Sequence, residues 1–284
     1  MTVTRFAPSP TGLLHLGHAY AAKVAHDLAR KNGGRFLLRQ EDIDTPRVRE
    51  EYYTKIEEDL KWLGLDWDGE ILRQNNRQEA YEKALENLKT RGLVYPCFCT
   101  RKEIQPEIRR SLGAPHGLAN HLYPGTCRLF SRNESMKRIA NGETHAWRFD
   151  SAKAAIIHGE LSFEDLRIGS NRVDIMVNGD AVIARKDIGI AYHLAVVVDD
   201  DFQKISHVTR GEDLLGSTHI HRQLQAVLGY TDPVYLHHGL VRDKKGIRLA
   251  KRDAARSIAQ LRENGTSAAE IFSMAEAALK KDQP

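Results

Sequence analysis

The feature that most constrains the fold is the junction between the first apolar stretch and the first helix. Residues 3–7 have the composition of a strand, and a turn containing Gly12 and Gly17 follows. An amphipathic helix begins directly behind this turn and ends at Gly33, after which residues 35–39 form a second strand. The expected buried face of the helix is Ala21, Val24, Ala25 and Leu28. This order predicts a strand–helix–strand unit, the building block of a parallel sheet.

The rest of the chain extends this pattern with one interruption. Two further helices are predicted from the apolar spacing of Tyr53, Ile56, Leu60 and Leu63, and of Tyr81, Leu85 and Leu88. Residues 95–130 carry cysteines and prolines with little periodicity, which indicates an insertion. We expect an apolar strand at 191–198, and a helix behind a capping box formed by Ser267 and Glu270. The predicted fold is α/β, a doubly wound parallel sheet with an insertion and a short helical C-terminal part.

The expected domain boundaries follow from these changes of pattern. We expect residues 1–94 to form the first half of the main α/β domain, and residues 95–190 to form the insertion. Residues 191–235 form the second half, and residues 236–284 contain a basic loop and the helical C-terminal part.

The amino-acid composition limits the classes of protein to which this chain can belong. The chain has 284 residues, of which 41% are hydrophobic and 28% charged, enough for a large buried core. No basic start precedes an apolar run, and no stretch approaches the ~18 apolar residues of a membrane span. Three cysteines cannot form a closed set of disulfides, so we expect free thiols in the cytoplasm. A soluble monomer with no membrane partner is the expectation, and the net charge of +4 is compatible with RNA binding.

The segment from Arg5 to His18 predicts a nucleotide site. It connects a strand to the start of a helix, where backbone N–H groups and the helix dipole favour an anion. His15 and His18 are three residues apart, so both imidazoles lie near this helix start. They can donate hydrogen bonds to phosphate oxygens as charge develops in a transition state.

These residues resemble the first signature of the class I aminoacyl-tRNA synthetases, H-I-G-H, which is present here as His15-Leu16-Gly17-His18. The preceding segment, Arg5 to Gly12, resembles the version found in glutamyl-tRNA synthetases. The second signature, K-M-S-K-S, is matched by residues 248–252, Arg-Leu-Ala-Lys-Arg, which depart from it at 248, 250 and 252. The resemblance implies a Rossmann-type catalytic domain with His15, His18 and Lys251 as catalytic residues and Mg²⁺-ATP as cosubstrate. The implied ATP-binding residues are Pro8, Thr11, Gly12, His15, Gly17, His18, Arg248, Leu249 and Lys251.

A pocket for glutamate needs a cation for a carboxylate and an acid for the ammonium group. Arg5 lies near the end of the first strand and Glu41 follows the second, where ligands of open parallel sheets bind. An arginine can hold a carboxylate through a bidentate charge-assisted pair. The resemblance implies a glutamate-binding set of Arg5, Ala7, Ser9, Glu41, Tyr192 and Arg210.

Cys97-x-Cys99 followed by Tyr123-x-x-x-Cys127 indicates a metal site, since three thiolates suit Zn²⁺. The arrangement resembles the zinc knuckle of the glutamyl-queuosine tRNA(Asp) synthetases, in which a tyrosine oxygen is the fourth ligand. The implied ligands are Cys97, Cys99, Tyr123 and Cys127, and His116 and His121 are alternatives for the fourth position.

The resemblance runs from Arg5 to about Ala254 and ends where a glutamyl-tRNA synthetase continues into its anticodon-binding region. It implies activation of glutamate with ATP and transfer to queuosine in the anticodon of tRNA(Asp). One alternative is a short glutamyl-tRNA synthetase that charges the 3′ end of tRNA(Glu). The other is an RNA-binding paralogue without catalysis, which the altered residues 248, 250 and 252 keep open.

Overall fold

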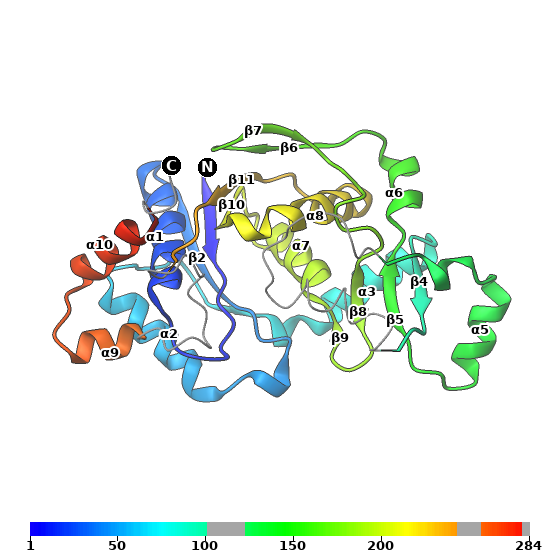
Figure 1. The fold of residues 1–284 in the computed structure, drawn as a ribbon, viewed down its shortest axis with the longest axis horizontal. Coiled ribbons are helices and arrows are strands. Elements are labelled where there is room, and N and C mark those ends of the chain that lie inside the picture. Colours follow the sequence, from blue (N-terminus) through cyan, green and yellow to red (C-terminus); the bar gives the residue numbers. More distant parts are fainter. Residues whose placement is uncertain (101–122, 243–256, 280–284) are drawn as a thin grey trace.

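A twisted sheet runs through the centre of the molecule (Figure 1). The computed structural model describes residues 1–100, 123–242 and 257–279. The sheet consists of two hydrogen-bonded parts that meet edge to edge at β1 and β10. One part has the order β3 (Leu72–Arg73), β2 (Arg35–Gln40) and β1 (Val3–Phe6), and the other has the order β10 (His207–Gly211), β11 (Val234–His238), β6 (Ser162–Asp165) and β7 (Gly169–Arg172). The ladders from β3 to β1 and from β10 to β6 are parallel, and β7 is antiparallel to β6. The predicted parallel α/β sheet is confirmed.

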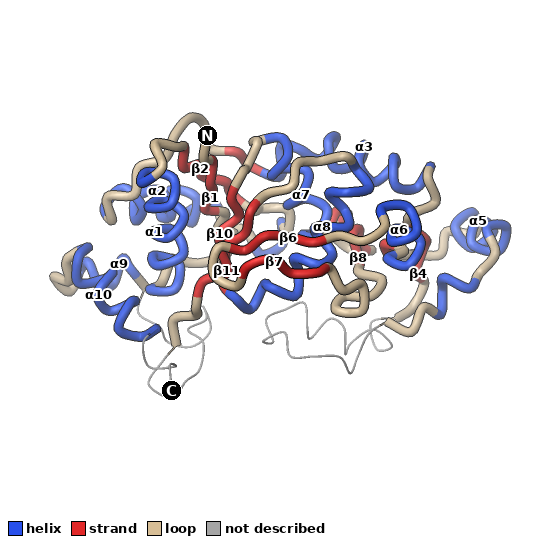
Figure 2. Tube along the Cα trace, turned by 90° about the horizontal axis from the view of Figure 1, so that it is seen from above, coloured by secondary structure: helices blue, strands red, loops and turns tan. Residues whose placement is uncertain are grey.

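The strands β1 and β10 lie side by side at the middle of this sheet (Figure 2). The Ser206 N–H group donates to the Val3 carbonyl oxygen at 3.0 Å, and Val208 packs in one buried cluster with Val3. From β1 the chain proceeds outward to β2 and β3, and from β10 it proceeds outward in the other direction to β11. Such a reversal creates a crevice at the carboxyl ends of the two central strands, where α/β proteins bind ligands.

One side of the sheet is covered by α1 (Leu16–Lys31) and α2 (Glu50–Trp62), against which α9 (Ile258–Glu263) and α10 (Ala268–Leu279) pack. The buried face of α1 is Ala19, Ala22, Ala25 and Ala29, so the expected face was wrong except at Ala25. Small side chains let the helix backbone approach the sheet: the Thr4 hydroxyl of β1 donates to the Ala25 carbonyl oxygen at 2.8 Å. The larger Val24 and Leu28 side chains are only partly buried. The Ser267–Glu270 capping box ahead of α10 is confirmed.

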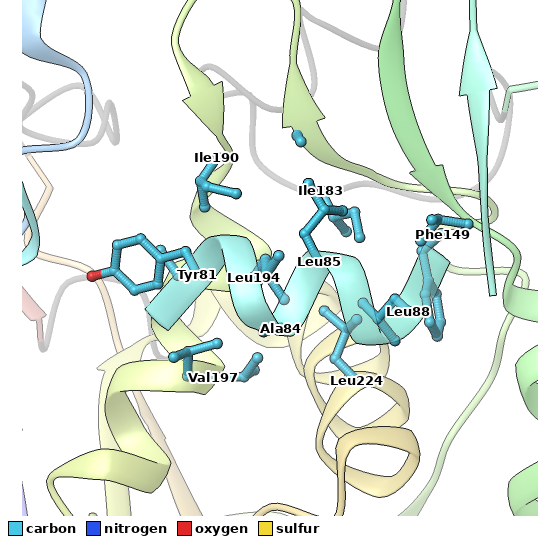
Figure 3. Packing of buried hydrophobic residues seen from close by; sticks show 14 of the residues in the cluster. Tyr81, Ala84, Leu85, Leu88, Phe149, Ile183, Ile190, Leu194, Val197 and Leu224 are labelled. Atoms are coloured by element: carbon cyan, nitrogen blue, oxygen red, sulfur yellow. The ribbon is translucent and has the colours of Figure 1, made fainter. Parts of the chain in front are cut away.

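The other helical layer contains α3 (Gln78–Thr90), α7 (Tyr192–Phe202) and α8 (Leu215–Leu228). Figure 3 shows α3 presenting Tyr81, Leu85 and Leu88 toward side chains from α7, α8 and the neighbouring strands. The expected strand at 191–198 was wrong, because these residues lie in α7. All five residues from Leu194 to Val198 are buried, and a helix enclosed on every side has the same continuous apolar run as a buried strand.

A second, antiparallel sheet lies at the far end of the molecule from α9 and α10 (Figure 1). It consists of β4 (Val94–Cys97), β5 (Ala146–Phe149), β8 (Val182–Arg185) and β9 (Gly189–Ile190), and is flanked by α5 (Arg132–Ala140) and α6 (Ser151–His158). Between β5 and β8 the chain returns to the large sheet as β6 and β7. The four-part division of the chain stays a prediction. Among the described residues, every helix is too short or too polar to cross a membrane.

Candidate active site

The carboxyl ends of the central strands bring the predicted pocket residues together. Arg5 is the third residue of β1, Glu41 follows β2 directly, and Arg210 is the fourth residue of β10. The Arg5 guanidinium crosses to β10 and donates to the Thr209 carbonyl oxygen at 3.2 Å. Arg5, Glu41 and Arg210 all influence the pKa of Tyr192, which lies in the first turn of α7 and whose pKa is raised by burial. These four predicted side chains therefore lie near one another at the carboxyl ends of the central strands.

Arg5 is held by a carboxylate that sequence reasoning missed. Its Nε lies 3.0 Å from Asp200 Oδ1, and Asp200 also accepts from Arg39, which is fully buried in β2. Burial alone would raise the pKa of Asp200, but Arg5 and Arg39 hold it below the ordinary value. Asp200 thus fixes two guanidinium groups on neighbouring strands. The run of three aspartates at 199–201, inside an otherwise apolar stretch, was the available signal.

Glu41 sits in a different electrostatic environment. Its side chain is 14% exposed, and its Oε1 lies 4.0 Å from Arg39 Nη1, too far for a hydrogen bond. Burial raises the pKa of Glu41 to about 7, and the nearby arginines offset only part of this effect. A cationic group placed beside this carboxylate would favour its ionised form.

Arg210 has only neutral hydrogen-bond acceptors among the described residues. Its Nε donates to His237 Nε2 at 3.2 Å, its Nη1 contacts His221 Nδ1 at 3.0 Å, and its Nη2 donates to Thr218 Oγ1 at 2.6 Å. No carboxylate in ranges 1–100, 123–242 and 257–279 forms an ion pair with Arg210. This guanidinium is buried and keeps a full positive charge, so the site has a fixed attraction for an anion.

The segment between β1 and α1 lines the same edge of the sheet. It contains the predicted residues Ala7, Pro8, Ser9, Thr11 and Gly12. It is tied to β2 by a hydrogen bond from the backbone N–H of residue 41 to the carbonyl oxygen of residue 8, at 3.0 Å. The start of α1 is thereby held beside the crevice.

Two histidines build the first turn of α1. His15 is the N-cap: its Nδ1 accepts from the Gly17 N–H at 3.1 Å, while His18 Nδ1 accepts from the His15 N–H at 3.2 Å. The two rings are 3.8 Å apart between centroids. Because each Nδ1 accepts a backbone proton, each neutral ring carries its own proton on Nε2, where it is a donor. A Cβ atom at position 17 would lie 3.1 Å from the His15 ring, so any larger residue there would push the ring from this position.

The second predicted signature, with Arg248, Leu249 and Lys251, lies outside the described residues. Its position relative to the crevice stays a prediction.

The cysteine cluster lies at the end of β4 and the start of the 3-10 turn Thr126–Leu129. The sulfur atoms of Cys97, Cys99 and Cys127 lie within 4.8 Å of one another, and Tyr123 Oη lies 3.5 Å and 3.4 Å from those of Cys97 and Cys99. Zinc–sulfur bonds of about 2.3 Å at tetrahedral angles separate two sulfurs by about 3.8 Å, so the donor set fits Zn²⁺. The alternative ligands His116 and His121 lie outside the described residues.

The surroundings act in opposite directions on two of the thiols: they favour the thiolate at Cys97, whereas burial raises the pKa of Cys99 to about 11. Burial alone would raise the pKa of Cys97, but the Tyr123 hydroxyl and the Arg148 guanidinium hold it below the ordinary value. Arg148 is itself fully buried and stacks over the Tyr123 ring at 3.7 Å. The cluster lies on a different sheet from Arg5, Glu41 and Arg210.

The described geometry can be compared with that of known proteins. Residues 1–276 match the family described as tRNA synthetases class I (E and Q), catalytic domain. A protein of Rhodobacter capsulatus named glutamyl-Q tRNA(Asp) synthetase is 47% identical over 95% of this chain and 98% of its own length. A glutamate–tRNA ligase of Syntrophus aciditrophicus is 39% identical over 92% of this chain and 54% of its own length.

Among solved structures, a glutamate–tRNA synthetase from Elizabethkingia anophelis superimposes with a TM-score of 0.74 at 30% identity. The match covers 89% of this chain and 53% of that structure. The chain therefore spans about half the length of the solved synthetases that it matches.

Proposed function

Because this chain belongs to the catalytic-domain family of the class I tRNA synthetases for glutamate and glutamine, we propose that it activates glutamate with ATP and transfers it to queuosine in the anticodon of tRNA(Asp). The observation that carries the proposal is that a buried cation, Arg210, and a largely buried acid, Glu41, both lie at the carboxyl ends of the central strands. This arrangement supports an amino-acid pocket next to an anion site.

Activation joins the glutamate α-carboxylate to the α-phosphorus of ATP. A carboxylate oxygen forms the new P–O bond while the bond to the β-phosphate oxygen breaks, and pyrophosphate leaves. His15 and His18 donate from Nε2 to phosphate oxygens, where charge increases in the transition state. Lys251, in the second signature, is proposed to add a mobile cation, and Mg²⁺ binds with the ATP phosphates.

The pocket recognises a dicarboxylic amino acid by charge. The Glu41 carboxylate accepts the substrate ammonium, and the Arg210 guanidinium receives a substrate carboxylate. A neutral amide at that position would leave the buried guanidinium without its counter-charge, so glutamine is rejected. Arg5, Ala7, Ser9 and Tyr192 complete the proposed set.

In the second step a hydroxyl of the acceptor attacks the activated carbonyl and AMP leaves. Transfer to queuosine is favoured because a relative named glutamyl-Q tRNA(Asp) synthetase is 47% identical to this chain, whereas a relative named glutamate–tRNA ligase is 39% identical. Charging of the 3′ end of tRNA(Glu) is the second candidate, supported by 39% identity to such a ligase.

A structural zinc ion is part of the proposal. Cys97, Cys99, Tyr123 and Cys127 would hold it, and the ion would cross-link β4 to the turn at Thr126–Leu129. A monomeric state and a cytoplasmic location stay predictions.

The test of the first step is glutamate-dependent exchange of labelled pyrophosphate into ATP, with purified protein and no tRNA. We expect exchange with glutamate and little with glutamine or aspartate. Absence of exchange would favour the RNA-binding paralogue, and equal exchange with glutamine would contradict the proposed pocket.

A further inference from the structure

The two arginines of the pocket are held in opposite ways. Arg5 is paired with a carboxylate, since its Nε lies 3.0 Å and its Nη2 lies 3.4 Å from the two oxygens of Asp200. Much of the positive charge of Arg5 is therefore already compensated by Asp200. Arg210 is equally buried, but the described groups that hold it are two imidazoles and a hydroxyl.

Each imidazole is oriented by a partner on its far side. Arginine can only donate, so His237 Nε2 accepts and the ring proton is on Nδ1, which lies 2.6 Å from Asp165 Oδ2. By the same reasoning His221 Nδ1 accepts from Arg210, and its Nε2–H group donates to His193 Nδ1 at 3.1 Å. Both rings are thus fixed as neutral acceptors facing the guanidinium.

The arrangement comes from five separate elements, including β10 with Arg210 and α7 with His193. His237 is on β11, His221 and Thr218 are on α8, and the orienting Asp165 ends β6. Burial and the nearby Arg210 lower the pKa of His237 to about 4, and that of His221 well below its ordinary value, so both rings are neutral at neutral pH.

We infer that His237 and His221 are positioning residues that fix the Arg210 guanidinium without compensating its charge, which reserves that charge for a carboxylate of the substrate. This inference rests on the proposed glutamate pocket. A carboxylate in place of either ring would hold the guanidinium equally well but would compete with the substrate. Neutrality of the acceptor, rather than its hydrogen bond alone, is then what preserves affinity.

Two pairs of variants separate charge from hydrogen bonding. His237→Gln and His237→Glu both place an acceptor near the original Nε2 position and differ only in charge. His221→Asn and His221→Asp do the same near the original Nδ1 position. The readouts are the KM for glutamate and the KM for ATP in pyrophosphate exchange, the calorimetric Kd for glutamate, and the Tm of each variant.

We expect the KM and Kd for glutamate to be at least about tenfold higher in each charged variant than in its neutral counterpart. The KM for ATP should differ by less than about threefold within each pair. Equal glutamate affinity within both pairs, or parallel losses for glutamate and ATP, would overturn the inference. If one charged variant does not fold, the pair at the other histidine decides.

The activity of the wild-type protein distinguishes failure of this inference from failure of the proposed function. If the wild type catalyses glutamate-dependent pyrophosphate exchange but the charged and neutral variants of each histidine bind glutamate equally well, only the positioning role of His237 and His221 is contradicted. Absence of glutamate-dependent exchange in the wild type contradicts the proposed function, and this inference with it.

Discussion

Replacing Glu41 by glutamine should stabilise the free protein at pH 8 while weakening its binding of glutamate. Burial raises the pKa of Glu41 from 4.5 to about 7. Between these two values the unfolded chain releases the proton while the folded protein retains it, so the stability contributed by this group falls as the pH rises. The cost is complete above about pH 7 and amounts to about 3 kcal/mol at most. A neutral amide of the same shape avoids it.

The assay is unfolding in urea at pH 8 and at pH 4.5, for the wild type and for Glu41→Gln. We expect the variant to be about 1–3 kcal/mol more stable at pH 8 and nearly equal at pH 4.5. The matched control is Asp200→Asn, because Arg5 and Arg39 hold the pKa of Asp200 below its ordinary value. That variant should be destabilised at pH 8. A Glu41→Gln protein that is less stable at pH 8, or equally shifted at both pH values, would refute the reasoning.

The same carboxylate should control activity. In the free wild-type protein, kcat/KM for glutamate should rise with pH and level off above about pH 7, as Glu41 ionises and can accept the substrate ammonium. In Glu41→Gln this rise should be absent and kcat/KM should be at least about tenfold lower at pH 8. A wild-type rise that persists unchanged in the variant would assign it to another group.

Three further changes test other parts of the account. Protein purified without added metal should contain one zinc ion per chain by elemental analysis. The Cys127→Ala variant should contain no zinc and should have a lower Tm. A zinc content near zero in the wild type would contradict the proposed zinc site. Gly17→Ala should lower kcat for pyrophosphate exchange about tenfold or more at nearly unchanged Tm, because the added methyl displaces the His15 ring; an unchanged kcat would mean that this ring position is not used. Lys251→Ala should lower kcat about 100-fold, and exchange at the wild-type rate would remove Lys251 from the proposed site.

The parts of the fold that the sequence could predict are those encoded by local patterns. The first strand, the turn and the helix start were predictable because their glycines, prolines and histidines are adjacent in the chain. The ends of β1 and β2 could likewise be predicted, and with them the neighbourhood of Arg5 and Glu41.

The sequence-based predictions were wrong where tertiary contacts determine the secondary structure or the buried face. Residues 194–198 form a continuous buried apolar run, so periodicity could not distinguish the enclosed helix α7 from a strand. The buried face of α1 is selected by side-chain size rather than by hydrophobicity, since alanines allow close contact with β1.

Local sequence patterns also could not predict the hydrogen-bond and ion-pair partners of the site residues. Asp200 is 195 residues from Arg5, and His237 is 72 residues from Asp165. Nothing near these positions in the sequence indicates the pairing, because each ion pair or hydrogen bond forms only when separate strands and helices assemble.

The most direct test of the central claim is the position of glutamate on RNA. Radiolabelled glutamate is incubated with the protein, ATP and total tRNA, the RNA is digested with ribonuclease, and the labelled fragment is identified. We expect label in the anticodon loop of tRNA(Asp), and only in RNA that carries queuosine. Label on the terminal adenosine of tRNA(Glu) would contradict it and leave the ordinary charging reaction as the function.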